Sequence, residues 1–219
     1  MSKFIFPRIM SKIKEKFKMI ILGKLKGLFS EFVHQHKMDA LSRVRTMQGV
    51  FIHDNFVLGE GSGFEIIGSN VKINIEENVL CRKYCNFLVQ EGGSLIIHKN
   101  VHFNNYGSIN CLERIEIGAD TYIGEGVKIY DHNHKHFFDD DGNLKVEKSH
   151  FTYKPVTIGQ NSWIMSNVTI LPGVEIGDNV IIGANNLIYK SIPSNSIIKA
   201  QIGQLMVNNH SEAKRFEKD

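Results

Sequence analysis

A cluster of histidines is the feature of this sequence best suited to chemistry. Three of the chain's ten histidines, His132, His134 and His136, fall within the stretch YDHNHKHFF that begins at Tyr130. Because the pKa of an imidazole lies near neutral pH, histidine is the natural general base there. If the stretch is extended, the three imidazoles share one face, which suits either one base with two bystanders or a metal-ligand cluster. A solvated polar loop is the structural alternative.

A six-residue repeat organises the chain around this cluster. Aliphatic residues recur at every sixth position from Ile158 to Ile188, and the same frame recurs upstream. Taken three hexads at a time, the frame begins turns at Ile75, Ile97, Ile117, Ile158 and Ile176. Neither the 3.6-residue period of a helix nor simple alternation produces this spacing. The pattern predicts a mainly β protein, a parallel β-helix with three short strands per turn and a narrow aliphatic core.

The repeat frame also assigns corner, core and surface positions. An Asn or Asp follows each turn's first aliphatic residue by three positions, at Asn78, Asn100, Asp120, Asn161 and Asn179. These side chains tolerate the left-handed backbone region, so they predict tight corners. Cys81 and Cys85 take a large and a small core position, which predicts packed thiols rather than a metal pair. Trp163 lies between core positions and is expected to face outward.

One long insertion, residues 135–157, interrupts the repeat and is expected to be an extruded loop. It contains DDDG at 139–142, whose spacing fits a hydrated turn rather than a calcium loop. The length of the loop favours an extended or polymeric binding partner over a very small one, because long ordered loops usually bind ligands. The expected organisation is a basic amphipathic helical segment at 1–50, a β-helix domain at 51–200 and a C-terminal tail at 201–219.

Composition and charge exclude several classes of protein. With 219 residues, 42% hydrophobic and 22% charged, the chain has the composition of a globular protein. Three cysteines and no secretory leader predict a reducing cytoplasmic location. Residues 1–45 carry 11 Lys or Arg against 3 acids, a net charge of +8, which leaves −5 for the remainder. Because the body is acidic, we expect no nucleic-acid partner.

The basic N-terminal segment has the pattern of an amphipathic helix. Apolar residues recur at helical spacing between Ile9 and Val33, with lysines between them and with Gly23 and Gly27 as the points where an interruption is expected. We favour a helix that caps the open end of the solenoid or packs between subunits, because solenoid ends expose core and strand edges. The alternative is peripheral contact of residues 1–45 with the inner face of a membrane.

The last third of the repeat resembles the bacterial hexapeptide-repeat acyltransferases. The resemblance is carried by VTIGQNSWI at 156–164, NVTILPGVEIGDNVIIGA at 167–184, and Lys190 with IPSNS at 192–196. It extends over roughly residues 70–200, and within the superfamily it is strongest to sugar and polysaccharide O-acetyltransferases. The resemblance implies a left-handed coil, acetyl-CoA as the acyl donor, and a homotrimer with active sites between subunits.

The resemblance also implies roles for particular residues. The family carries its base in an Asn-His or similar dipeptide just before the extruded loop, a place that Asn133 and His134 occupy here. His134 is therefore expected to take the proton of a sugar hydroxyl as that oxygen attacks the thioester. Either Asp131 or a backbone carbonyl is expected to hold its tautomer. Expected acceptor contacts are Tyr130, His132, His136 and Asn105, with a corner-forming role as the alternative for Asn105.

A groove between neighbouring coils is the cofactor site that the resemblance implies. Trp163 matches an aromatic residue beside the thiol end of the cofactor, Ser166 and Ala184 match small residues of the groove, and Lys190 matches a lysine near the pantetheine or phosphates. Where relatives usually have GNPAK, this chain has AQIGQ at 200–204. The change removes one expected phosphate contact. No metal is expected.

These expectations converge on an acetyl-CoA-dependent O-acetyltransferase that modifies a capsule, a lipopolysaccharide, another surface polysaccharide, or a precursor. The nearest alternative is N-acetylation of an amino sugar or nucleotide sugar. A zinc enzyme of carbonic-anhydrase type is disfavoured, since that family pairs ligand histidines five residues apart and no histidines here have that spacing. A non-catalytic binding module is the third alternative.

Overall fold

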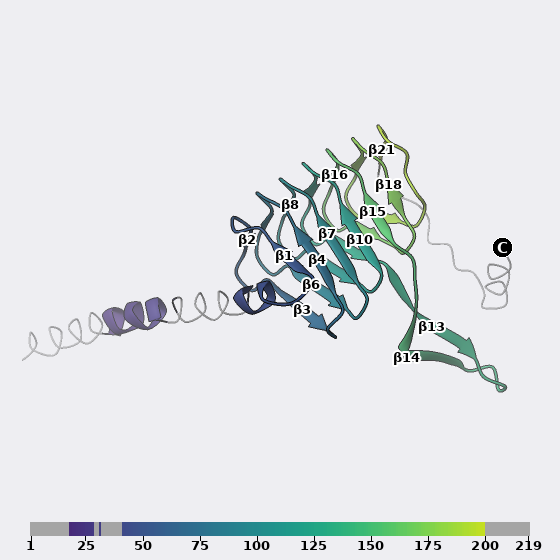
Figure 1. Ribbon diagram of the computed structural model, residues 1–219, viewed down its shortest axis with the longest axis horizontal. Coiled ribbons are helices and arrows are strands. Elements are labelled where there is room, and N and C mark those ends of the chain that lie inside the picture. Colours follow the sequence, from purple (N-terminus) through teal and green to yellow (C-terminus); the bar gives the residue numbers. More distant parts are fainter. Residues whose placement is uncertain (1–17, 29–30, 32–40, 200–219) are drawn as a thin grey trace, which may run out of the picture.

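A parallel β-helix forms the body of the protein, as the repeat predicts. The computed structural model describes residues 18–28, 31 and 41–199. Three parallel sheets form the faces of a prism, and each turn contributes one strand to each sheet (Figure 1). Neighbouring strands in a sheet therefore come from successive turns of the chain, and each turn satisfies the backbone hydrogen bonds of the next.

The strands of the prism are two to five residues long. The first sheet contains β1 (Val50–Ile52), β4 (Lys72–Ile75), β7 (Ser94–Ile97), β10 (Arg114–Ile117), β15 (Val156–Ile158) and β18 (Glu175–Ile176). The second contains β2 (Val57–Leu58), β5 (Leu80–Cys81), β8 (His102–Phe103), β11 (Tyr122–Ile123), β16 (Trp163–Ile164), β19 (Ile181–Ile182) and β21 (Ile197–Ile198). The third contains β3 (Gly63–Ile67), β6 (Asn86–Gln90), β9 (Ser108–Cys111), β12 (Lys128–Tyr130), β17 (Thr169–Ile170) and β20 (Leu187–Ile188).

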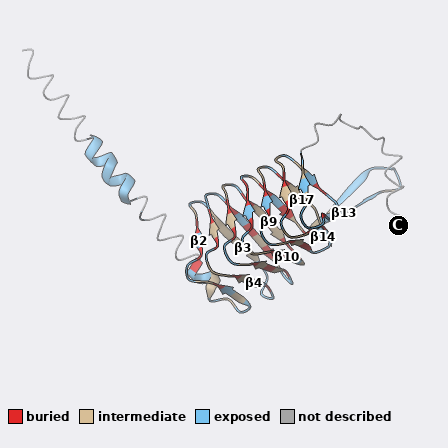
Figure 2. Cartoon of the chain, turned by 90° about the horizontal axis from the view of Figure 1, so that it is seen from above, coloured by how far each residue is buried: buried red, intermediate tan, exposed pale blue. Residues whose placement is uncertain are grey.

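The core is a set of aliphatic columns along the prism axis. The five residues predicted to begin turns align in the first sheet, where they are Cα partners in the order Ile75, Ile97, Ile117, Ile158 and Ile176. Their exposed fractions are 0–2%. Burying one such side chain contributes about 1.5–3 kcal/mol relative to leaving it exposed. The buried residues line the inside of the prism in Figure 2.

The corners between the first and second sheets confirm the Asn and Asp pattern. All five predicted corner residues have left-handed backbone, with φ between 54° and 60°. Their side chains also bond between turns: Asn78 Nδ2 donates to Asn100 Oδ1 at 3.1 Å, and Asn100 Nδ2 donates to Asp120 Oδ1 at 2.8 Å. The same side chains thus permit the corner and connect adjacent turns.

The predicted positions of the cysteines and the tryptophan are also confirmed. Cys81 and Cys85 are buried in the core, and burial raises the pKa of both thiols. Trp163 lies on the outer face of β16 and is 46% exposed.

The N-terminal end of the solenoid is covered by residues 41–47. Leu41 belongs to the core cluster, and Val44 and Met47 pack against it. The helical residues 18–28 are instead exposed throughout, and the helix continues through Gly23 and Gly27. Within the described residues, the contacts that cover this end thus come from 41–47. Residues 1–17, 29–30, 32–40 and 200–219, which include much of the expected helical segment and the C-terminal tail, lie outside the described residues. Within the described ranges, no helix is long and apolar enough to cross a membrane.

A two-stranded arm leaves the prism between the fourth turn, which ends at β12, and the fifth, which begins at β15. It consists of β13 (His132–Phe138) and β14 (Leu144–Tyr153), which pair antiparallel with an irregularity between His134 and His136. The arm thus begins three residues before the expected insertion, and it projects away from the solenoid (Figure 1). The DDDG segment forms the turn at its tip, where Asn143 N donates to Asp139 Oδ1 at 2.8 Å.

Candidate active site

A buried carboxylate anchors the root of the arm to the solenoid. The Asp131 side chain is fully buried and accepts hydrogen bonds from the backbone N–H groups of Leu112, at 2.9 Å, and Glu113, at 2.7 Å. The Asp131 carbonyl accepts a further bond from Lys154 N at 2.8 Å. Because Lys154 directly follows β14, these bonds fix both strands of the arm where they leave and re-enter the prism.

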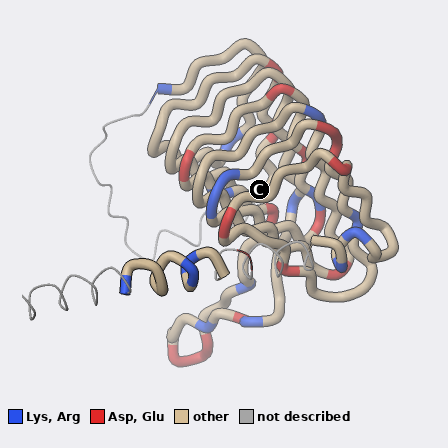
Figure 3. The backbone as a smooth tube through the Cα atoms, turned by 90° about the vertical axis from the view of Figure 1, so that its left-hand side faces the viewer, with Lys and Arg blue, Asp and Glu red and all other residues tan. Residues whose placement is uncertain are grey.

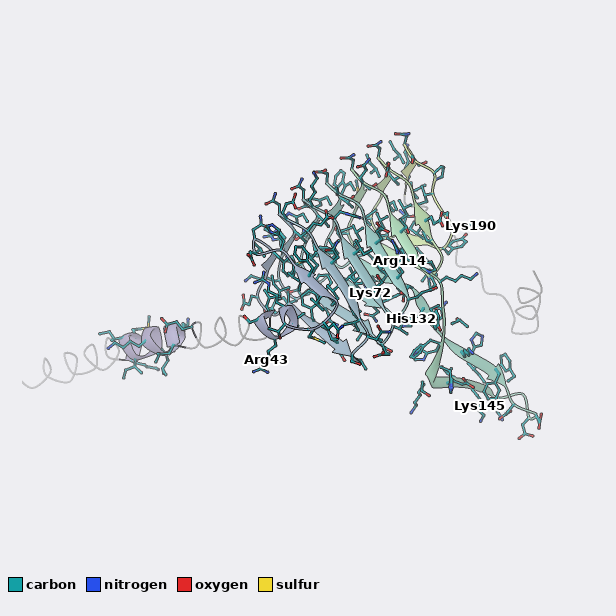
Figure 4. The ribbon with its side chains drawn as sticks, viewed as in Figure 1. Arg43, Lys72, Arg114, His132, Lys145 and Lys190 are labelled. Carbon is teal, nitrogen blue, oxygen red and sulfur yellow. The ribbon has the colours of Figure 1, made fainter. Side chains whose placement is uncertain are left out.

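His132 is the first residue of the arm and packs against its root. Its Nδ1 lies 3.3 Å from Asp131 Oδ1. Its ring is edge-on to those of Tyr130 and Phe151, with centroid distances of 6.4 Å and 5.3 Å. The side chain is only 13% exposed. Figure 4 shows His132 beside the solenoid, at the point where the arm begins. The carboxylate of Asp131 thus contacts His132 rather than His134.

His134 lies further out on the arm and is exposed. Its Nδ1 is 3.0 Å from the backbone carbonyl oxygen of Glu147 on the opposite strand. Because a carbonyl only accepts, this bond requires the proton on Nδ1 and leaves the Nε2 lone pair free. The Phe151 ring packs against the imidazole at a centroid distance of 4.6 Å. Of the two partners considered for His134, the structure contains the backbone carbonyl.

A cavity of about 670 Å³ opens beside His134 on the arm. Its polar lining includes Asn133, His134 and His136, and its apolar lining includes Phe137 and Val146. Sugars present hydroxyl groups along their edges and C–H groups on their faces, so a lining of both kinds suits them. His132 does not line this cavity. The arrangement provides an imidazole with a free lone pair beside a space that a polar acceptor can enter.

The remaining site candidates divide between two edges of the third sheet. Asn105, Ser166 and Ala184 lie at the corner that follows the second sheet, and Trp163 lies on that second sheet. Ser166 and Ala184 occupy adjacent turns, because Asn185 N bonds to the Ser166 carbonyl at 2.9 Å. Lys190 lies past the opposite edge, after β20, with its ammonium 5.7 Å from the Tyr189 ring centroid. Within one chain, the cofactor candidates are therefore not gathered into one site.

Asn105 has the hydrogen bonds of a corner residue. Its Oδ1 accepts from Lys83 N at 3.2 Å, and its Nδ2 donates to Glu125 Oε2 at 3.4 Å. Both partners lie on adjacent turns, so the amide connects three turns of the prism. The left-handed residue of this corner is Tyr106, with φ of 60°, so Asn105 connects turns without forming the corner itself, and its contact with an acceptor stays a prediction.

Two groups that contact His134 could not be predicted from the sequence. The Glu147 carbonyl is a backbone atom, and its pairing depends on the register of β13 against β14. Phe151 packs against both His132 and His134. The apolar residues of β14 weakly predict a strand. Because the insertion lacks the hexad repeat, however, the sequence does not show which residues of this strand pair with the histidines.

Thiol chemistry has no support at this site. Cys81, Cys85 and Cys111 are all buried and unpaired. Burial raises the pKa of the Cys111 thiol, and the neighbouring charge of Asp131 raises it further. A buried, protonated thiol is a poor nucleophile. In the part of the chain that the structure describes, no group of three or more His, Cys, Asp or Glu residues is arranged to hold a metal ion.

The fold defines the class of protein: a left-handed parallel β-helix interrupted by an extruded arm. The crystal structure of the polysialic acid O-acetyltransferase OatWY superposes on this fold with a TM-score of 0.55 at 22% identity, over 76% of this chain and 91% of that chain. A model of the family described as bacterial transferase hexapeptide (six repeats) matches residues 155–190.

Curated relatives agree with this class. The Escherichia coli (strain K12) protein named lipopolysaccharide biosynthesis O-acetyl transferase WbbJ is 36% identical over 130 residues, which cover 58% of this chain and 66% of that protein. The protein named colanic acid biosynthesis acetyltransferase WcaF, from the same organism, is 31% identical over 94 residues, 42% of this chain and 46% of that protein. The chain thus spans less than two thirds of the length of these relatives. Residues 155–190 thus carry the hexapeptide repeat, and the chain is similar to acetyltransferases of the hexapeptide-repeat superfamily.

Proposed function

We propose that this protein is an acetyl-CoA-dependent O-acetyltransferase whose acceptor is a saccharide hydroxyl. The acceptor belongs to a capsule, a lipopolysaccharide or another surface polysaccharide, or to its precursor. The observation that carries the proposal is the His134 imidazole, which has its Nδ1 proton bound to a carbonyl and its Nε2 lone pair free beside an open cavity. The names of the relatives, which are acetyltransferases of polysaccharide biosynthesis, support the same chemistry.

His134 acts as the general base in this mechanism. Its Nε2 takes the proton of the acceptor hydroxyl while that oxygen attacks the thioester carbonyl of acetyl-CoA. Collapse of the tetrahedral intermediate breaks the C–S bond, forms the acetyl ester and returns the proton to the CoA thiolate. The bond from Nδ1 to the Glu147 carbonyl holds the imidazole in the required tautomer throughout. Asp131, through its bonds at the root, acts as a positioning residue for the strand that carries the base.

We also propose that the site is completed by a second copy in a homotrimer. His134 lies on the arm, whereas Trp163 lies on the second sheet, so one chain keeps the base and the cofactor aromatic apart. The second sheet presents a column of outward side chains in register, which could cover one another between copies: Val57, Leu80, His102, Tyr122, Trp163, Ile181 and Ile197. Light scattering should give three times the chain mass of 24.9 kDa. A monomer that transfers acetyl groups would contradict this arrangement.

The N-terminal segment suits contact with an anionic membrane surface at its cytoplasmic side. Helical residues 18–28 expose Ile21, Leu25 and Leu28 together with Lys24 and Lys26. Figure 3 shows basic positions and no acidic one along this helix. An amphipathic basic helix of this kind binds anionic lipid through apolar burial and charge. We expect the full-length chain to float with vesicles that contain phosphatidylglycerol and not with neutral vesicles. Equal flotation with both vesicle types would contradict the proposed contact with anionic lipid.

The test of the activity is acetyl transfer to matched acceptors. Purified protein is incubated with labelled acetyl-CoA and either hydroxyl-only oligosaccharides or their amino-sugar counterparts. We expect an ester product that mild hydroxylamine cleaves. A stable amide formed only from amino sugars would identify the activity as N-acetylation instead of O-acetylation. Failure to transfer to any saccharide, in protein that binds acetyl-CoA, would overturn the assignment of the acceptor.

A further inference from the structure

A second, smaller pocket lies at the root of the arm, apart from the cavity beside His134. It has a volume of about 350 Å³ and occupies the corner where the third sheet passes into the first. Its walls come from successive turns and include Asn70, Lys72, Ser94, Glu113, Arg114 and Pro155. Ligand sites usually span about 300–1,000 Å³. The pocket is therefore at the lower end of that range, which suits a single sugar residue.

Two cationic side chains flank this pocket on the first sheet. Lys72, Ser94 and Arg114 are Cα partners on consecutive strands β4, β7 and β10. Because adjacent strands lie about 4.8 Å apart, Lys72 and Arg114 start about 10 Å from each other on one face, with the serine hydroxyl between them. Figure 4 shows both side chains on that face, on the same side of the molecule as His132.

Both cationic side chains have hydrogen-bond donors available for a ligand. Among the residues that the structure describes, Lys72 Nζ forms no ion pair. Arg114 pairs with Glu116 through one nitrogen at 2.6 Å, which leaves its other N–H donors available. A carboxylate or phosphate between these side chains would accept charge-assisted hydrogen bonds from both.

Glu113 adds an acceptor to the same pocket. Its backbone N–H donates to Asp131 Oδ2, so it sits directly against the root of the arm. Its side-chain Oε2 is shielded from solvent and has no hydrogen-bond partner within the described part of the chain. A shielded carboxylate oxygen without a donor is unfavourable and needs a partner.

We propose that this pocket is an acceptor subsite for an acidic sugar residue. Lys72 and Arg114 hold the anionic group of the sugar, and Glu113 accepts a hydrogen bond from one of its hydroxyls. The inference rests on the proposed function, since the pocket joins the catalytic arm through Asp131 and Pro155. An acceptor that occupies both the subsite and the cavity beside His134 must contain more than one sugar. The subsite thus selects an anionic oligosaccharide or polymer.

The test is calorimetric titration of the full-length protein, because binding is then read without turnover. The probes are a galacturonic acid trisaccharide, its carboxyl-reduced neutral counterpart, and galactose 1-phosphate. We expect at least one charged probe to bind about tenfold more tightly than the neutral trisaccharide, with a preference that weakens in high salt. Tighter binding of the galacturonic acid trisaccharide identifies the anionic group of the ligand as a sugar carboxylate. Tighter binding of galactose 1-phosphate identifies it as a phosphate.

Variants locate the effect in the pocket. Lys72→Gln should reduce the charge preference, because Arg114 alone then holds the anionic group, and Glu113→Ala, which removes the acceptor, should weaken charged and neutral probes alike. Lys99→Gln is the matched control, since Lys99 is exposed on the same solenoid and does not line the pocket. Equal affinity for charged and neutral probes, or an unchanged preference in Lys72→Gln, overturns the subsite. Binding without acetyl transfer would keep the subsite and refute the proposed function.

Discussion

The solenoid and the arm are built on opposite principles. In the solenoid, strands are short and alternate buried with outward residues, as β10 does with its pattern of two buried isoleucines, Ile115 and Ile117. In the arm, the strands are longer, but β13 has no fully buried residue and six of its seven residues are exposed (Figure 2). An isolated two-stranded hairpin is marginally stable in water. The body therefore supplies the stability, and the arm carries the histidines of the proposed site.

The base on the arm should show the largest effect of any single substitution. His134→Ala removes the proton acceptor, so we expect kcat to fall by about two to four orders of magnitude. The melting temperature and acetyl-CoA affinity should change little, because the side chain is exposed and outside the core. Steady-state kinetics and calorimetry measure the two effects.

His136→Ala is the matched control for that experiment. His136 lies two residues further along the same strand and lines the same cavity, but the described structure gives its ring no hydrogen bond. Its removal should affect kcat much less. If His134→Ala retains normal turnover, the base is elsewhere, and His132 with its Asp131 contact becomes the candidate.

Truncations in the two regions should differ sharply in their effect on stability. Ile117→Ala leaves a cavity in a fully buried column and should cost about 2–5 kcal/mol of unfolding free energy. Phe137→Ala, at a half-exposed side chain on the arm, should change that free energy by less than about 0.5 kcal/mol. Urea titration gives both values. A similar loss from the two variants would show that the arm also packs as part of a core, as it would in an assembly.

The corners offer a smaller effect specific to the solenoid. Asn100 has φ of 60° and bonds to residues on both adjacent turns. Asn100→Ala should cost about 1–2 kcal/mol, because alanine disfavours left-handed backbone and loses both bonds. Asn100→Gly keeps the backbone accessible and should cost less. Equal losses in the two variants would assign the effect to the hydrogen bonds alone.

A pH dependence of stability should also originate in the solenoid. Burial lowers the pKa of His98, but hydrogen bonds to Glu116 and Glu76 on the adjacent turns outweigh this, so its pKa is raised above 6.5. A raised folded-state pKa stabilises the fold fully below the unfolded-state value, and that stabilisation is lost as pH rises through the folded-state value. Because the pair is partly exposed, the effect should be below about 1 kcal/mol.

His98→Gln tests this by comparing urea unfolding at about pH 5.5 and about pH 8.5. The wild type should lose stability relative to the variant as the pH rises through that range. Parallel pH profiles of the two proteins would mean that His98 is not the group responsible.

The same division explains what the sequence could and could not predict. Asn78 and Cys81 occupy their expected corner and core positions because the hexad frame fixes every side chain of the solenoid relative to the prism axis. The Asp131–His132 contact and the pairing of His134 with the Glu147 carbonyl lie beyond that frame. Both depend on where the arm leaves the prism and on the register of its strands. No local periodicity encodes either one.

The most direct test of the account is calorimetric titration of the full-length, folded protein with acetyl-CoA, compared with CoA lacking its 3′-phosphate. The account predicts saturable micromolar binding of acetyl-CoA. A loss of affinity on removing the phosphate would show that recognition of the nucleotide end survives the altered sequence at 200–204. No binding of either ligand to folded trimer would contradict the assignment of this chain as an acetyl-CoA-dependent transferase.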